Sequence, residues 1–214
     1  MTCLVFDLDG TLTDTLEDLW RSTCAALEAC NMPLRSIDEV RQFVGNGVHR
    51  LIERAVPQGT SDEDLERCFQ AFREHYVVHC QDHTHLYPGV PELLAELRSR
   101  GVPMAVVSNK LQAGVTELEQ RLFPGIFQVA LGEREGVPRK PAPDMVQLAL
   151  IEMGVSASDA IYIGDSEVDI ATARNAGLPC VSVLWGFRDR DLLVEHGATT
   201  LIEQPCQLLD FLNM

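Results

Sequence analysis

The sequence predicts an α/β protein: a doubly wound parallel sheet with an all-helical segment inserted near the N-terminus. Three patterns support this fold class. Residues 3–6 form a short apolar run that stops at Asp7, which is typical of a buried strand ending in a polar loop. Residues 16–87 carry helical periodicity without a convincing strand. From residue 88 onward, apolar runs alternate with helical patterns, as expected for parallel strands joined by helices.

The inserted segment is predicted to hold several helices. Ser36 and Glu39 have the spacing of a capping box, in which a serine hydroxyl and a glutamate each bond a free amide at the helix start. Pro88 followed by Gly89 marks the return to the sheet. We therefore expect a core and a helical cap. The core comprises residues 1–14 and 88–214, and the cap comprises residues 15–87.

Beyond this boundary the predicted elements alternate. Strands are expected at 104–107, 127–131, 160–163, 180–184 and 200–202. Helices are expected at 91–100, 112–122, 143–153 and 168–176, with a C-terminal helix from about residue 206. Gly101, Gly154 and Gly177 follow three of these helices, and glycine favours the backbone conformation that ends a helix.

Composition narrows the class of protein. The chain has 214 residues, 46% of them apolar, which is enough for a sizeable core. Its formal net charge of -15 disfavours binding to nucleic acid or to an anionic membrane, although a small anionic ligand remains compatible. Seven cysteines, an odd number without a Cys-x-x-Cys pair, do not suggest a disulfide framework. Without a visible signal peptide or long apolar run, we expect a cytoplasmic protein.

Polar residues follow several of the predicted strands. In an open parallel sheet, ligands bind beyond the carboxyl ends of the strands, so these residues should lie close together. They are Asp7 and Asp9 after the first strand, Ser108, Asn109 and Lys110 after the second, and Asp165 and Asp169 after the fourth. Lys140 precedes a helix and can reach the same edge. Clustered carboxylates need a cation, and hard oxygen ligands suit Mg²⁺ better than Zn²⁺.

Each of these motifs alone has an ordinary structural explanation. An Asp-Gly pair is often a turn, and Ser108 with Asn109 can cap a helix. Their coincidence at separate strand ends of one sheet is what favours a functional site.

Four ordered segments resemble the motifs of the haloacid dehalogenase superfamily. They are residues 7–14, residues 106–109, Lys140 with Pro141 followed by Pro143 and Asp144, and residues 164–170. The resemblance covers nearly the whole chain, including the helical insertion after the first motif. It implies a Rossmann-like core and a magnesium-dependent phosphatase. Within the superfamily, residues 44–47 and 185–188 are most similar to the phosphoglycolate phosphatase group.

The resemblance also implies a role for each matching residue. Asp7 would attack phosphorus and form an aspartyl-phosphate, and Asp9 would act as general acid and then general base. The dehalogenases of the superfamily lack an acid at the position of Asp9, so its presence favours phosphate chemistry. The remaining roles follow the same resemblance. Ser108, Lys140, Thr11 and Asn109 would bind or position the phosphoryl group; Asp7, Asp165 and the carbonyl of Asp9 would bind Mg²⁺; Asp169 would lie in a second layer around the metal.

Several questions stay open at the level of sequence. A phosphomutase of the same superfamily and a non-enzymatic binding protein are alternatives to a phosphatase acting on a small phosphorylated metabolite. The physiological substrate and the choice between monomer and homodimer cannot be read. Residues 45–47, Gly-Asn-Gly, are either a substrate-contacting loop or a plain break between helices. The histidines at positions 75, 79, 83 and 85 are expected to be solvated or packed rather than metal ligands.

Overall fold

The computed structural model describes residues 2–212 and separates into two compact units. The first contains the chain up to Thr13 and again from Leu86 onward. The second is the continuous segment Asp14–His85. None of the helices within residues 2–212 is long and apolar enough to cross a membrane.

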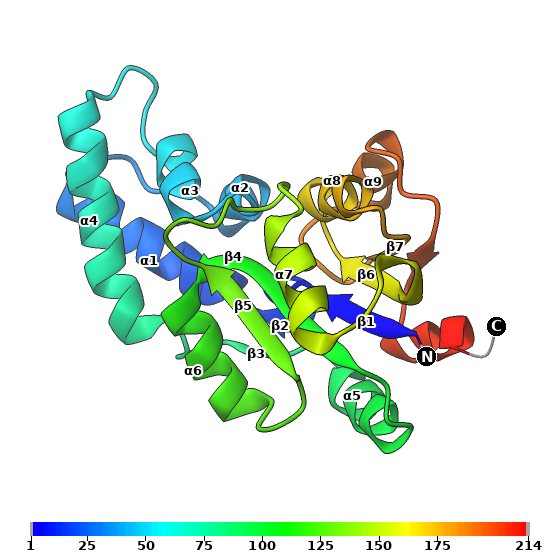
Figure 1. Ribbon diagram of the computed structural model, residues 1–214. Helices are drawn as coiled ribbons and strands as arrows, with labels where there is room; N and C mark the ends of the chain where they lie inside the picture. The colour runs from blue at the N-terminus through cyan, green and yellow to red at the C-terminus, as the bar shows by residue number, and fades with distance from the viewer. Residues whose placement is uncertain (1, 213–214) are drawn as a thin grey trace. The chain divides into compact units, whose positions relative to one another are not determined.

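A six-stranded sheet in the order β5-β4-β1-β6-β7-β8 forms the centre of the first unit (Figure 1). Every neighbouring pair in it is parallel, so the predicted α/β class is confirmed. The strands are β1 Cys3–Phe6, β4 Met104–Leu111, β5 Val129–Glu133, β6 Ala160–Gly164, β7 Cys180–Val183 and β8 Leu201–Ile202.

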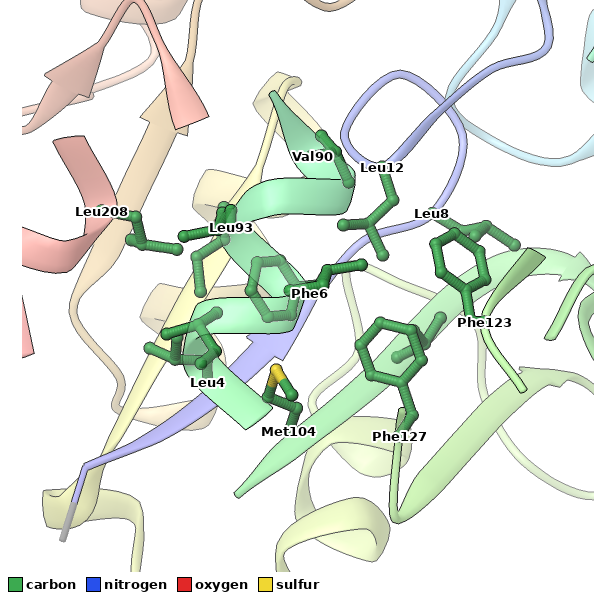
Figure 2. Packing of buried hydrophobic residues seen from close by; sticks show 14 of the residues in the cluster. Leu4, Phe6, Leu8, Leu12, Val90, Leu93, Met104, Phe123, Phe127 and Leu208 are labelled. Carbon is green, nitrogen blue, oxygen red and sulfur yellow. The ribbon is translucent and has the colours of Figure 1, made fainter. Parts of the chain in front are cut away.

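Side chains of β1 alternate between the two faces of the sheet, and each face is covered by helices. Leu4 and Phe6 belong to one buried cluster, whereas Cys3 and Val5 belong to the other. The first cluster takes its helical residues from α5 Val90–Ser99, α6 Gln112–Leu122 and the 3-10 helix η2 Pro205–Leu212. Figure 2 shows Leu4 and Phe6 packed near Leu93 of α5.

The opposite face is covered by α7 Asp144–Met153 and α8 Glu167–Ala176. Both helices end at a glycine in the left-handed conformation, Gly154 and Gly177, as their positions in the sequence indicated. Two short elements complete the unit, the 3-10 helix η1 Ala157–Asp159 and α9 Arg190–Glu195.

Some predicted boundaries were wrong. The C-terminal helix expected from about residue 206 is present, as the 3-10 helix η2. Strand β4 does not stop at Val107 but continues to Leu111, because its pairing with β5 shifts register between these residues and then resumes. Residues 108–110 therefore lie within the last part of the strand rather than in a loop after it.

The second unit is helical. Its helices are α1 Leu16–Ala29, α2 Ile37–Phe43, α3 Val48–Ala55 and α4 Asp62–His79. The capping box of Ser36 and Glu39 is present at α2, and Ser61 accepts a backbone hydrogen bond at the start of α4. A core that includes Leu27, Ile52 and Phe72 fills the space between the helices. The two-residue strands β2 Thr13–Asp14 and β3 His85–Leu86 pair where the chain passes between the units, although no strand was expected at 85–86.

Candidate active site

Three adjacent strands, β4, β1 and β6, bring the predicted site residues to one edge of the sheet. Asp7 follows β1, Ser108 lies in the last part of β4, and Asp165 follows β6. All three are at most 8% exposed, so this strand edge is a buried polar cluster. Burial on this scale requires each charged group to have partners, because isolated buried charges are strongly disfavoured.

The loop after β1 carries two aspartates, and each contacts a different lysine. Asp7 Oδ1 accepts a hydrogen bond from the backbone N–H of Leu8 at 2.7 Å and lies 2.7 Å from Lys140 Nζ. The Asp9 side chain is more exposed, at 18% against 11% for that of Asp7, and its Oδ1 lies 3.3 Å from Lys110 Nζ. Gly10 completes the loop with a φ of 87°, and a side chain there would overlap the carboxylate of Asp165.

Lys140 connects the aspartates. Its Nζ lies 2.7 Å from Asp7 Oδ1 and 2.8 Å from Asp169 Oδ1, and it donates to the hydroxyl of Tyr162 at 3.0 Å. The side chain of Asn109 fixes the backbone of Lys140. Asn109 Nδ2 donates to the Lys140 carbonyl at 3.1 Å, and Asn109 Oδ1 accepts from the Lys140 N–H at 2.9 Å. Burial alone lowers the pKa of Lys140, but Asp169 and Asp7 outweigh it and raise that pKa well above its ordinary value. Lys140 is therefore a permanent cation.

Asp7, Asp165 and Asp169 form a group of three buried carboxylates, each with an oxygen within 4.8 Å of the others. Burial, followed by repulsion from Asp169, raises the pKa of Asp7 well above its ordinary range, against the opposing effect of Lys140. The same two causes raise the pKa of Asp165 to about 7. Among residues 2–212 this is the one cluster of histidine, cysteine or carboxylate groups with the spacing of a metal site.

Asp169 differs from its two neighbours. Its Oδ1 accepts from Lys140 and from the Tyr162 hydroxyl at 3.1 Å, and its Oδ2 accepts from the N–H of Ser166 at 3.1 Å and from its hydroxyl at 2.6 Å. Although burial raises it, the pKa of Asp169 is lowered below its ordinary value by Lys140 and these hydrogen bonds. Protein groups thus compensate the charge of Asp169 more fully than the charges of Asp7 and Asp165.

Thr11 and Ser108 have protein partners at the same edge. The hydroxyl of Thr11 donates to Asp165 Oδ1 at 3.2 Å, so Thr11 orders the carboxylate. Ser108 Oγ accepts from the backbone N–H of Lys110 at 3.2 Å. Contacts of Thr11, Ser108 and Asn109 with a phosphoryl group remain predictions.

The sequence did not assign two features that shape this site. Tyr162 lies inside β6, and its hydroxyl bridges Lys140 and Asp169. The loop after β7 packs onto Asp165: the N–H of Phe187 donates to its Oδ2 at 2.8 Å, and a side chain at Gly186 would overlap Asp165. The Trp-Gly-Phe run at 185–187 was a usable signal for this loop, but its contact partners were not.

In the helical unit, the histidines at positions 75, 79, 83 and 85 each have a different partner. His75 Nδ1 lies 3.0 Å from Ser22 Oγ, and His79 Nδ1 lies 2.7 Å from Asp82 Oδ2. Helix α4 ends at His79, so the later histidines leave its face. His83 Nδ1 lies 3.7 Å from Glu17, and His85 Nδ1 lies 2.8 Å from the carbonyl of His83. The rings of His75 and His79 lie side by side, with centroids 4.3 Å apart, but within residues 2–212 no group of three metal-ligating side chains includes any of these histidines. Residues 45–47 connect α2 and α3, and their predicted substrate contact stays a prediction.

The arrangement as a whole suits an anionic ligand held together with a divalent cation. The cluster offers two under-compensated carboxylates, Asp7 and Asp165, and Lys140 contacts the first of them. Asp9 lies two residues beyond Asp7, is partly accessible, and is not part of the three-carboxylate group, so it is available for proton transfer.

Comparison with known proteins finds relatives along nearly the whole chain. The family model of haloacid dehalogenase-like hydrolases matches residues 4–183. A phosphoglycolate phosphatase from Vibrio parahaemolyticus is 37% identical over 217 residues, covering 98% of this chain and 92% of the relative. Another from Pseudomonas savastanoi pv. phaseolicola is 33% identical over 216 residues, covering 98% and 76%.

A crystal structure agrees with the sequence relatives. It is of a protein from Lactobacillus delbrueckii subsp. bulgaricus proposed to be a phosphoglycolate phosphatase, with a TM-score of 0.94 and 34% identity, and the match covers 98% of this chain and 97% of that one. These matches agree with the motif order seen in the sequence and with the parallel sheet. The chain therefore belongs to the family of haloacid dehalogenase-like hydrolases, and it is a phosphatase that acts on phosphoric monoesters.

Proposed function

We propose that the protein hydrolyses a small phosphate monoester of the phosphoglycolate type, with Mg²⁺ and through an aspartyl-phosphate on Asp7. The observation that carries this proposal is the division between the two aspartates of one loop. Asp7 is buried against Lys140, and Asp9 is partly accessible beside a second lysine. Each carboxylate thus contacts a lysine, Asp7 the more closely, and the more accessible Asp9 can exchange a proton with the substrate.

In the first step, an oxygen of Asp7 attacks phosphorus and the bond from phosphorus to the ester oxygen breaks. Asp9 gives a proton to the leaving oxygen, so the alcohol departs neutral. In the second step, Asp9 takes a proton from water, the water oxygen attacks phosphorus, and the bond to Asp7 breaks. Inorganic phosphate leaves, Asp7 is again an ionised carboxylate, and Asp9 again carries the proton that it gave to the leaving oxygen. Lys140 contacts Asp7 throughout and offsets negative charge on the phosphoryl oxygens.

The donor set fits Mg²⁺. The proposed ligands are the carboxylates of Asp7 and Asp165 and the backbone carbonyl of Asp9, all hard oxygen donors. The raised pKa values of Asp7 and Asp165 support this assignment, because burial and Asp169 disfavour the ionised form of both carboxyls more than Lys140 favours it. When bound, Mg²⁺ would offset the charge of these carboxylates and of the phosphoryl group. Asp169, already saturated by Lys140, Tyr162 and Ser166, would position Lys140 instead of binding the metal.

A direct test measures phosphate release from phosphoglycolate by the wild type and by Asp7→Asn, with Mg²⁺ and with a chelator. The wild type should turn over many times with Mg²⁺ and stop with the chelator, and Asp7→Asn should lose activity about 10⁴-fold or more, because its amide is a poor nucleophile. Asp159→Asn is the matched control, since Asp159 is an exposed residue of η1.

The covalent intermediate needs its own measurement. Rapid acid quench with radiolabelled ester should leave label on the wild type and none on Asp7→Asn. Full turnover by Asp7→Asn would sink the proposal. Release that requires an added sugar bisphosphate would favour a phosphomutase.

A further inference from the structure

The chain contains only two lysines, Lys110 and Lys140, although lysines and arginines together number 17. Both lysines are buried, at 7% and 4% exposure, whereas lysine is normally a surface residue. Both also lie in the candidate active site, where Lys140 contacts Asp7 and Lys110 contacts Asp9. The mechanism proposed above uses Lys140 alone, so the second buried ammonium group needs an explanation of its own.

Several contacts hold Lys110 in place. Its backbone N–H donates to Ser108 Oγ at 3.2 Å, and its Nζ lies 3.3 Å from Asp9 Oδ1. Its aliphatic stem passes over Gly114, where a Cβ would come within 3.2 Å of Lys110 Cε. Helix α6 begins at Gln112, just after Lys110, and has no acidic residue in its first turn. The end of β4 and the start of α6 therefore accommodate a lysine and keep negative charge of their own away from it.

The contact with Asp9 fixes where the ammonium group lies relative to a substrate. Asp9 must reach the leaving ester oxygen to protonate it, so a group touching the Asp9 carboxylate lies beside that oxygen. In an ester of the phosphoglycolate type, one carbon separates the ester oxygen from a carboxylate, and the carboxylate oxygens lie about 3 Å from the ester oxygen. The ammonium of Lys110 and such a carboxylate would thus meet on the leaving-group side.

We propose that Lys110 binds the carboxylate of the substrate and so selects phosphate esters with a carboxylate next to the ester-bearing carbon. This inference rests on the proposed function and assigns the leaving-group half of the substrate to a residue. Lys140 serves the phosphoryl half, and Lys110 serves the other half. A charge-assisted hydrogen bond in a buried site discriminates strongly against an ester that lacks the anionic group.

The alternative is that Lys110 serves only Asp9, as its structural counter-ion. The two roles predict different substrate dependence. A counter-ion of Asp9 acts on every ester alike, because every leaving oxygen needs the same proton. A carboxylate-binding residue acts only on esters that carry a carboxylate.

The test compares two esters of the same chain length, phosphoglycolate and 2-hydroxyethyl phosphate, with the wild type, Lys110→Met and Lys110→Arg. Lys110→Met should lower kcat/KM for phosphoglycolate about 100-fold, mainly through KM, and lower it much less for 2-hydroxyethyl phosphate. Lys110→Arg should recover part of the loss, because it keeps the charge. An equal loss on both esters, or no loss on either, would overturn the inference.

A second measurement does not depend on whether Lys110→Met folds. Selective ¹³C labelling of lysine gives signals from only two residues, and Lys110→Arg identifies which belongs to Lys110. In the inactive Asp7→Asn background, phosphoglycolate should shift the Lys110 Cε signal and 2-hydroxyethyl phosphate should leave it nearly unchanged. Equal shifts with both esters would contradict the inference. If the wild type hydrolyses neither ester, the proposed function itself fails, which is a different result from hydrolysis without selectivity.

Discussion

Tyr162 shows how one buried hydroxyl can connect two charges of the site. It accepts a hydrogen bond from Lys140 at 3.0 Å and donates to Asp169 at 3.1 Å, and its side chain is fully buried. The burial raises its pKa well above the ordinary value, so the hydroxyl stays protonated and keeps its donor. This hydroxyl helps to hold the ammonium group of Lys140 in contact with Asp7.

At this scale we predict that Tyr162→Phe lowers kcat/KM about tenfold and the free energy of unfolding by about 1–2 kcal/mol. The change leaves Lys140 and Asp169 buried with one partner fewer each. Steady-state kinetics and chemical denaturation measure the two effects. Tyr87→Phe is the control, because Tyr87 is a buried tyrosine of the apolar cluster of the same unit. Wild-type kinetics in Tyr162→Phe would remove Tyr162 from the positioning of Lys140.

At the scale of elements, the loop after β7 packs against Asp165 and holds its carboxylate in place. Phe187 donates its N–H to one carboxylate oxygen, and Thr11 donates its hydroxyl to the other. Trp185 Nε1 donates to the Thr11 carbonyl at 3.0 Å and so ties this loop to the one after β1. Gly186 lies so close to Asp165 that only hydrogen fits. Two loops, distant in sequence, therefore orient one carboxylate.

We expect Gly186→Ala to push Asp165 out of place and to raise the Mg²⁺ concentration for half-maximal activity about 10- to 100-fold, as changes behind metal ligands commonly do. A magnesium titration of the activity measures this. Gly101→Ala is a useful comparison, because Gly101 has φ 69° but no atom near its would-be Cβ. It should cost about 1 kcal/mol of stability without changing the magnesium requirement. An unchanged requirement in Gly186→Ala would disprove the proposed role of the loop.

At the scale of the whole molecule, the buried carboxylates make stability depend on pH. Burial and Asp169 raise the pKa of Asp165 to about 7, from an ordinary value of 3.8. A carboxyl whose pKa is higher in the folded state stabilises the fold fully below its unfolded pKa, and this contribution is lost as the pH rises through about 7. The shift is worth at most about 4 kcal/mol.

The metal-free protein should therefore lose stability between about pH 5 and pH 8. Because Mg²⁺ competes with protons for the same carboxylates, it should raise the unfolding temperature much more at pH 8 than at pH 5. Thermal unfolding at both pH values, with saturating Mg²⁺ and with a chelator, checks this. In Asp165→Asn the pH-dependent gain from Mg²⁺ should largely disappear. A gain of the same size at both pH values would count against Asp165 as a ligand.

Local sequence patterns were sufficient for the α/β class and for most elements. Alternating apolar runs and glycine stops act over a few residues, so helices such as α7 and α8 could be located from sequence alone. The strand-end rule also grouped Asp7, Ser108 and Asp165 from the sequence alone. It failed at β4, whose last residues are held by pairing with β5, a partner beyond the reach of a local pattern.

By itself, the sequence determined which residues stand at the strand ends and the phosphatase motifs that they form. Only the tertiary structure decided how these residues share the work. Lys140 and Tyr162 both donate hydrogen bonds to Asp169. Burial raises the pKa values of Asp7 and Asp165, and Lys110 contacts Asp9. The physical reason is that pKa values and ion pairs depend on burial and on distances between atoms far apart in the chain, which the order of residues does not specify.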